Sequence, residues 1–365
     1  MTAHTLINTT TPRLVFLLPL LLLLGACASP SYYAQAVSGH LELMRQRQDI
    51  EDLLQNPAVD PELAQSLELT RNIRAFAFDS LGLPESDSYT QYAETGRDAV
   101  SWNVVATPEF SLEARTWCFL VAGCVPYRGY FKQESARKFA RKLESKAYDV
   151  AVSPASAYST LGWFDDPLLD TMLRYSDARL AGLIFHELAH QAIYVRGDAA
   201  FNEAFAGMVE EAGVESWLAS RDESDQLASW EKSREVSRQF TEFLAGHREQ
   251  LQALYNSGQP EKDMRKEKQQ AFERLRSGYQ DLVGRQWGGV DYFSGWFQRE
   301  INNAGLALVD TYRGGSCAFE ALYRSTAGDM QAFLELAASK ARLGKNDRAA
   351  WLNQKCSEIA SASNL

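Results

Sequence analysis

The chain contains, from Leu183 to Gly207, the stretch LIFHELAHQAIYVRGDAAFNEAFAG, which joins a His-Glu-x-x-His motif to an Asn-Glu pair. On a helix, His186 and His190 project from one face about a turn apart, the spacing that two ligands of a tetrahedral zinc ion need. Glu187 lies roughly 100° around that helix from His186, where it can accept a proton from the attacking water. Glu203 can supply the third ligand from the next helix and leave a fourth position open. The stretch predicts zinc-dependent hydrolysis of peptides.

The surrounding residues predict two helices that carry these ligands. Ser176 or Asp177 can cap the first helix, which continues as an apolar stripe at three- and four-residue spacing until Gly197 ends it. Asp198 can cap the second helix. Small residues early in the second helix would let it approach the first closely. They are Ala204, Ala206 and Gly207.

The motif has a plain alternative, a buried helix with two incidental histidines. The chain has only 5 histidines, so a chance occurrence is on the order of half a percent. For Glu203 the alternative is an exposed helix residue. Glu210, two turns further on, could orient a ligand histidine or could be a solvated residue. Asp165 or Asp166 could meet the free amino group of a substrate, although their position before a proline favours a turn.

HELAHQ followed by FNEAFA resembles the active site of gluzincin aminopeptidases, in which a longer spacer separates the two segments. The shorter spacer resembles a bacterial family of zinc aminopeptidases that are predicted lipoproteins. The resemblance implies that His186, His190 and Glu203 bind Zn²⁺ and that Glu187 is the general base. Further segments that resemble this family are Ser31–Ala36, Gly123–Phe131, Ala157–Phe164 and Asn302–Ala304.

Gluzincins usually stabilise the oxyanion with a Tyr or His that lies C-terminal to the glutamate ligand. We expect Tyr312 in this role because it follows Asn302–Ala304, and we expect His247 to be structural. The other tyrosines considered are Tyr279, Tyr292 and Tyr323.

The function remains open between three readings. The chain lacks the Gly-x-Met-Glu-Asn segment of the large aminopeptidases. The alternatives to an aminopeptidase are therefore an endopeptidase that acts on misfolded envelope proteins and a non-catalytic zinc-binding scaffold.

The N-terminal residues predict a lipoprotein signal peptide over 1–26. Leu14–Leu24 is an apolar run with the length of a signal sequence, too short to cross a bilayer comfortably. Leu24–Cys27 resembles a lipobox, which implies cleavage before Cys27 and attachment of lipid to it. Because Ala28 follows, we expect a membrane anchor in the bacterial cell envelope, on the periplasmic face of the outer membrane. An ordinary secretory cleavage is the alternative.

Composition and periodicity set the fold class. The formal net charge is −10, which argues against nucleic acid as a partner. We expect a mostly α-helical α+β fold with a small sheet and a zincin-like core, as a single domain over 27–365. A charged helical hairpin over 222–285 would be an insertion in that domain.

Further elements follow from local patterns along the chain. The predicted helices are Tyr33–Leu54, Pro61–Leu81, Gln133–Lys146, Glu223–Tyr255 and Lys262–Val283, and the C-terminal part, Trp296–Ile359, is predicted to be helical as well. The predicted strands are Ala99–Ala106, Trp117–Val121 and Tyr148–Ser153. An oxidising compartment favours two disulfides, of which Cys118–Cys124 and Cys317–Cys356 is one of three possible pairings.

Overall fold

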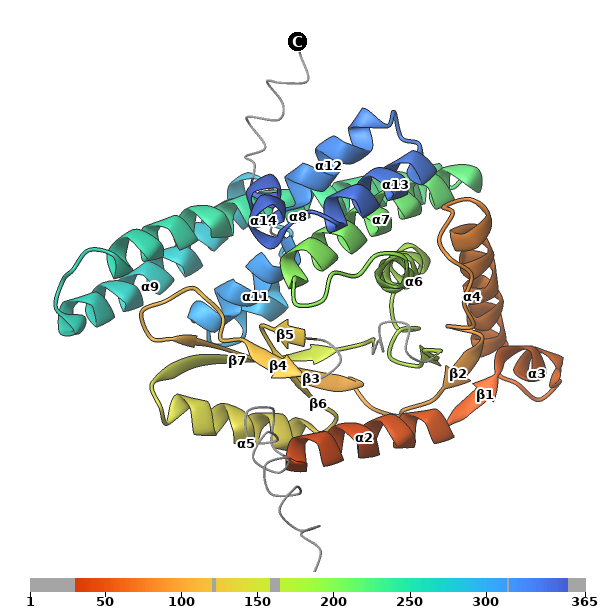
Figure 1. Ribbon diagram of the computed structural model, residues 1–365, viewed down its shortest axis with the longest axis horizontal. Coiled ribbons are helices and arrows are strands. Elements are labelled where there is room, and N and C mark those ends of the chain that lie inside the picture. Colours follow the sequence, from red (N-terminus) through yellow and green to blue (C-terminus); the bar gives the residue numbers. More distant parts are fainter. Residues whose placement is uncertain (1–29, 120–122, 158–164, 314, 354–365) are drawn as a thin grey trace, which may run out of the picture.

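A computed structural model describes residues 30–119, 123–157, 165–313 and 315–353. The described chain is rich in helices and has small sheets, so the predicted α+β class is confirmed (Figure 1). The helices are α2 (Pro30–Arg45), α3 (Ile50–Gln55), α4 (Pro61–Asp79), α5 (Gln133–Glu144), α6 (Asp177–Ala192), α7 (Ala199–Ser220), α8 (Ser224–Tyr255), α9 (Glu261–Arg285), α10 (Ser294–Phe297), α11 (Asn303–Arg313), α12 (Ser316–Ser325), α13 (Met330–Ala341) and α14 (Lys345–Leu352). The strands are β1 (Arg47–Asp49), β2 (Gln91–Ala93), β3 (Ser101–Pro108), β4 (Trp117–Phe119), β5 (Gly123–Val125), β6 (Arg128–Tyr130), β7 (Tyr148–Ala155) and β8 (Leu168–Leu169).

Two predicted helix boundaries are wrong. The single helix expected over Tyr33–Leu54 is α2 and α3 with β1 between them, because β1 pairs with β2 and the Asp49 side chain caps α3. α6 ends at Ala192, five residues before the Gly197 that was expected to end it. Gly197 instead has a φ of 77° in the connection to α7, a conformation that glycine adopts without strain.

The main sheet has the order β6-β3-β7, with both neighbours antiparallel to β3. α5 packs on this sheet through its apolar face, which contains Ala136, Ala140 and Leu143. α11 contacts β3 and β7. Only β3 among the described strands pairs with β7, so β7 lies at an edge of the sheet.

α6 and α7 form the centre of the largest apolar core (Figure 1). α6 is surrounded by α4 and α7, and α7 also contacts α8, α11, α12 and α14. Their buried apolar residues include Ile184, Phe185 and Leu188 of α6 and Phe201 and Phe205 of α7. The two helices expected to carry the ligands therefore pack against each other within this core.

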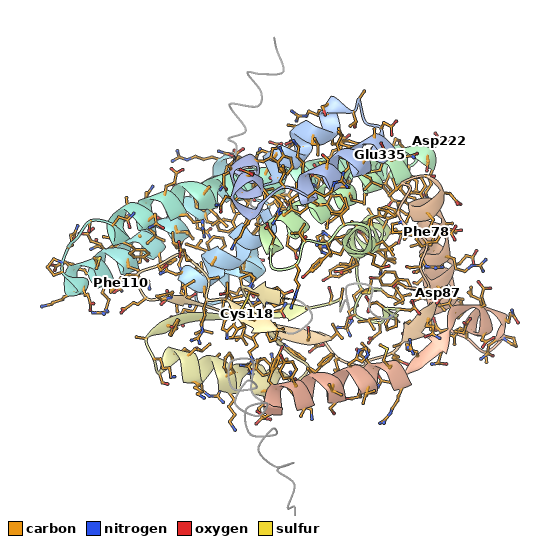
Figure 2. The ribbon with its side chains drawn as sticks, viewed as in Figure 1. Phe78, Asp87, Phe110, Cys118, Asp222 and Glu335 are labelled. Atoms are coloured by element: carbon orange, nitrogen blue, oxygen red, sulfur yellow. A yellow bond between two sulfur atoms is a disulfide. The ribbon has the colours of Figure 1, made fainter. Side chains whose placement is uncertain are left out.

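α8 and α9 occupy the segment in which the helical hairpin was expected, and they project to one side in Figure 1. The hairpin has its own apolar cluster, which includes Phe240, Leu275 and Tyr279. Lys268 of α9 forms an ion pair of 2.7 Å with Asp149 of β7. Phe110, labelled in Figure 2, lies in the β3–β4 loop beside the hairpin, with its ring 5.9 Å from that of Tyr255. These contacts fix the hairpin against the main sheet.

A disulfide joins Cys118 of β4 to Cys124 of β5, as predicted, and Cys118 is labelled in Figure 2. Cys317 is disulfide-bonded too, whereas its expected partner Cys356 lies outside the described residues. In the part of the chain that is described, no helix has the length and apolar character needed to cross a membrane. Cys27 and the expected signal peptide also lie outside the described residues.

Candidate metal centre

The two histidines of the motif lie on one face of α6. Ser176, one of the two expected caps, begins the helix by accepting a hydrogen bond from the backbone N–H of Arg179. The ring centroids of His186 and His190 are 4.9 Å apart, as the four-residue spacing predicts. The opposite apolar face is buried, which fixes the rotation of the helix.

The connection between α6 and α7 fixes the position of Glu203. Buried Asn202 accepts a hydrogen bond from the N–H of Val195 (2.8 Å) and donates one to its carbonyl (2.9 Å). Asp198 caps α7, and its other carboxylate oxygen accepts a hydrogen bond of 2.7 Å from Arg348 of α14. Glu203, in the first turns of α7, is thereby held opposite the two histidines.

Glu203 faces both imidazoles. Its Oε2 lies 3.3 Å from Nε2 of His186, and its Oε1 lies 4.0 Å from Nε2 of His190. One ligand atom from each of these three residues lies within 4.8 Å of the others. Ligand atoms about 2.1 Å from a tetrahedral ion would be roughly 3.4 Å apart. The three expected ligands are therefore close to the spacing that a single zinc ion requires.

Glu210 lies behind His186. Its Oε2 is 3.1 Å from Nδ1 of His186, and its Oε1 accepts a hydrogen bond of 2.7 Å from Arg179. A carboxylate on the second ring nitrogen fixes the orientation of a ligand imidazole and makes it a better electron donor. Glu210 was expected either to orient a ligand histidine or to be solvated, and in the structure it contacts His186.

The carboxylates of the centre favour a positive charge between the three ligand residues. Burial would lower the pKa of His186, but hydrogen bonds with Glu203 and Glu210 raise it to about 10. Burial would raise the pKa of Glu210, but His186 and Arg179 lower it to about 2. Two ionised carboxylates thus enclose one imidazole, and a proton provides the positive charge in the metal-free protein.

His190 has the opposite character. Burial and the neighbouring His186 lower the pKa of His190 to about 4, so that its ring is neutral at pH 7. Its Nδ1 is buried and has no hydrogen-bond partner in the described part of the chain. A neutral ring can offer the lone pair of Nε2 to a metal.

Glu187 is half-buried and lies near Tyr89. Tyr89 is fully buried, and burial, then the nearby Glu187 and Asp166, raise the pKa of its hydroxyl. The Tyr89 N–H donates to the carbonyl of Asp166 at 2.7 Å. Asp166 is therefore part of the interior near Tyr89, whereas Asp165 is exposed.

Close approach of α6 and α7 depends on glycines that the sequence reasoning did not select. A Cβ on Gly182 would lie 3.1 Å from Cγ of Glu210, and one on Gly213 would lie 2.8 Å from the ring of Phe185. Gly207 has no neighbour within 4 Å at this position, so its expected role is wrong. The face of each helix that meets the other is fixed by packing, which the pattern of small residues does not reveal.

Tyr194 is a neighbour of the centre that sequence reasoning missed. Its ring centroid lies 6.5 Å from that of His190, and burial, then Glu203, raise the pKa of its hydroxyl. Its position four residues after His190 could have indicated this contact, because such residues are neighbours on a helix. However, α6 ends between them, at Ala192.

The other residues considered as oxyanion donors are Tyr312, Tyr279, Tyr323, Tyr292 and His247. Tyr312 lies in α11, and its side chain is outside the described residues. Tyr279 bonds to Asp291 in the hairpin cluster, and Tyr323 donates to the carbonyl of Gly328. Tyr292 is exposed. His247 packs on Phe243 of the hairpin at 4.7 Å between rings, which agrees with its expected structural role.

This arrangement defines a class of site, two imidazoles and a carboxylate from consecutive helices around a space suited to one divalent cation. The chain matches the family model described as "Putative aminopeptidase" over residues 31–352. The chain belongs to this family, as the sequence resemblance predicted. No curated protein and no solved structure matches the chain.

Proposed function

We propose that the protein is a zinc-dependent aminopeptidase of the bacterial cell envelope with a zincin-like core. The observation that carries the proposal is the convergence of His186, His190 and Glu203, whose ligand atoms lie within 4.8 Å of one another. Membership of an aminopeptidase family supports a peptide substrate.

The residues of the centre have distinct roles in this proposal. Zinc held by the three ligands would polarise the peptide carbonyl and lower the pKa of a water to about 7. Glu187 accepts a proton from the attacking water and delivers it to the leaving amine. Glu210 holds the ring of His186 through Nδ1, with Arg179 fixing the carboxylate in turn.

A donor is needed for the negative charge that develops on the carbonyl oxygen. Tyr312 remains the predicted donor. Tyr194 is a second candidate because its ring contacts that of His190. Replacing each tyrosine by phenylalanine would distinguish them, because the loss of one hydroxyl donor at this position costs about 10²–10³-fold in kcat.

The edge of β7 that pairs with no described strand can hold the substrate backbone beyond Val150. The carbonyl of Val150 faces outward and accepts a hydrogen bond from Asn302 at 3.0 Å. Val152 and Pro154 follow at alternate positions on the same edge, where a proline costs no ladder hydrogen bond. Just beyond the strand, the carbonyl of Ser156 accepts from Thr171 at 2.6 Å, in the segment that leads to α6. An extended peptide added to this edge would run toward the metal helix.

Assays on paired peptides test the activity. The purified protein is offered a peptide with a free amino end and the same peptide with an acetylated end, before and after metal removal by a chelator. We expect cleavage of the free peptide only, loss of activity with the metal and recovery on adding Zn²⁺. Cleavage of both peptides would establish the endopeptidase instead. If neither peptide is cleaved in a metal-dependent way, the protein is a non-catalytic zinc-binding scaffold instead.

The envelope location is a separate part of the proposal. It rests on the Leu24–Cys27 segment of the sequence, which resembles a lipobox. Mass spectrometry of the membrane-bound protein should find an acylated Cys27 at the amino end, and Cys27→Ala should abolish the modification. A mature protein with an unmodified end would contradict the lipid anchor while leaving the peptidase proposal intact.

A further inference from the structure

The exposed side of α5 carries a charge opposite to that of the whole chain. The formal net charge of the protein is −10. The exposed residues from position 132 to 146 nevertheless include six cations and only two carboxylates, Glu134 and Glu144. No ion pair joins any of the six to another described residue. The cations are Lys132, Arg137, Lys138, Arg141, Lys142 and Lys146.

The fold does not require these cations. Ala136, Ala140 and Leu143 on the opposite face of α5 are buried against the main sheet. α5 is held in place by that apolar contact, and the cations project to solvent. A surface helix that serves only solubility would mix both signs of charge. The excess of one sign indicates an anionic partner.

The N-terminal end of α2 lies beside α5. The guanidinium of Arg128 lies 4.0 Å from the ring centroid of Tyr32 in α2 and 4.6 Å from that of Phe139 in α5. Figure 1 shows α2 and α5 end to end along one side of the molecule, opposite α12 and α13. The two helices form one continuous surface, which we call the α2–α5 surface.

The α2 part of this surface exposes apolar side chains. Val37 is 56% exposed and Leu41 is 46% exposed, one turn apart on the same side of the helix. In sequence, the apolar run Leu14–Leu24 ends only six residues before Pro30, the first residue of α2. The chain therefore enters the fold at this surface from its most apolar segment.

We propose that the α2–α5 surface binds an anionic phospholipid membrane. Val37 and Leu41 enter the headgroup region, and the cations of α5 contact lipid phosphates. An amphipathic surface that places apolar residues beside basic ones is the pattern of helices that lie on a membrane. An acidic protein or polymer would match the cations but not the exposed apolar pair. The proposal depends neither on peptidase activity nor on lipid attached to Cys27.

Footprinting of lysines in the full chain tests the proposal. The detergent-solubilised protein is added to preformed vesicles of phosphatidylcholine alone or with about one-third phosphatidylglycerol, and exposed amines are acetylated. We expect Lys138 and Lys142 to react about tenfold more slowly on the anionic vesicles and at the solution rate on neutral ones. Lys262 and Lys266 of α9 are exposed internal controls, and their rates should not change.

Salt and lipid composition separate this surface from an anchor alone. Roughly 1 M NaCl shortens the screening length to about 3 Å and should restore the reaction of the α5 lysines on anionic vesicles. Equal reaction on both vesicles would overturn the proposal. Equal protection on both vesicles would also overturn it, because the anchor alone would then explain the result.

Matched variants provide a second measurement. One variant replaces Arg137, Lys138, Arg141 and Lys142 by Gln, and its control replaces Lys262, Lys266, Arg274 and Arg285 of α9 by Gln. Both lose four positive charges from exposed helix positions. Circular dichroism establishes that each variant folds.

Lys132 and Lys146 remain as reporters in both variants. Their protection on anionic vesicles should fall to less than about twofold in the α5 variant and persist in the α9 control. Equal loss in both variants would show that only net charge matters, and unchanged protection in both would show that these cations do not touch lipid. Either result overturns the proposal.

Discussion

The α6–α7 pair and the α8–α9 hairpin are both built from consecutive helices, but they bury different chemistry. The fully buried residues of α8 and α9 are all apolar or aromatic, and none of the charged residues of the hairpin is among them. α6 and α7 bury His190, Asn202 and Glu210 among their apolar residues. The hairpin is thus explained by packing alone, whereas the α6–α7 pair contains groups that packing does not require.

Buried ionisable groups lower stability unless each has a partner. In the α6–α7 pair Glu203 and Glu210 each point at a histidine, Glu210 also pairs with Arg179, and the histidine nitrogens that face Glu203 converge on one space. Several ionisable groups are therefore buried together and paired with one another, which is typical of functional sites. The comparison gives four predictions, described from the largest expected effect to the smallest.

Glu187→Gln should have the largest effect on activity. The amide is nearly the same size but cannot accept the proton of the attacking water, so kcat should fall by about 10²–10⁴-fold. Zinc content, measured by atomic absorption, should not change. Activity within a few-fold of the wild type would remove Glu187 from the mechanism. The α6–α7 pair would then lack a catalytic base, as the hairpin does.

Leu275→Ala should affect stability without affecting the centre. Leu275 is fully buried in the hairpin cluster, and the substitution leaves a cavity that costs about 2–5 kcal/mol of unfolding free energy. Denaturant unfolding measures the loss. At a temperature where the variant is folded, its zinc content and kcat should equal those of the wild type. A loss of metal in the folded variant would show that the two regions are coupled.

Glu210→Gln should weaken metal binding by about 10–100-fold, because the ring of His186 loses its carboxylate partner. Competition with a chromophoric chelator measures the affinity. Glu211→Gln is the matched control, since Glu211 pairs with Arg234 of α8 and contacts no ligand histidine. An equal change in both variants would mean that charge in general, and not the contact with His186, sets the affinity.

Metal affinity should rise about tenfold between roughly pH 6 and 7, below the range in which most of a zinc-bound water would be ionised. His186 has a pKa of about 10 in the metal-free protein, so binding must release its proton throughout this range. Calorimetry in buffers of different ionisation enthalpy should detect about one proton released per metal. His247→Gln in the hairpin should leave the slope unchanged. A slope near zero would contradict the proton held between Glu203 and Glu210.

The same proton links pH to the stability of the metal-free protein. The pKa of His186 is raised on folding from 6.5 to about 10. Its contribution to stability is therefore complete below pH 6.5 and is lost as the pH rises through about 10. His190 works in the opposite direction, because its pKa is lowered to about 4 and the contribution is lost as the pH falls from 6.5 toward 4.

The sequence predicted those parts of the centre that depend on local geometry. The spacing of His186 and His190, the caps at Ser176 and Asp198 and the disulfide Cys118–Cys124 are all decided within a few residues. Each requires only the period of a helix or the reach of a side chain.

The parts that sequence reasoning missed depend on contacts between distant segments. β1 divides the first predicted helix because it pairs with β2, more than 40 residues away. Gly182 and Gly213 matter because they face Glu210 and Phe185 across the helix pair. Tyr194 lies beside His190 although α6 ends between them at Ala192, so the periodicity of the helix does not place it. Such contacts follow from tertiary packing, which a periodic pattern in one segment does not contain.

Anomalous diffraction at the zinc absorption edge tests the central claim most directly. Crystals of protein purified without added chelator should give one strong anomalous peak about 2.0–2.2 Å from Nε2 of His186, Nε2 of His190 and a carboxylate oxygen of Glu203. A peak at this position would establish that the α6–α7 pair holds zinc. A map without a peak there after soaking in Zn²⁺, or with the ion bound to other residues, would contradict the account.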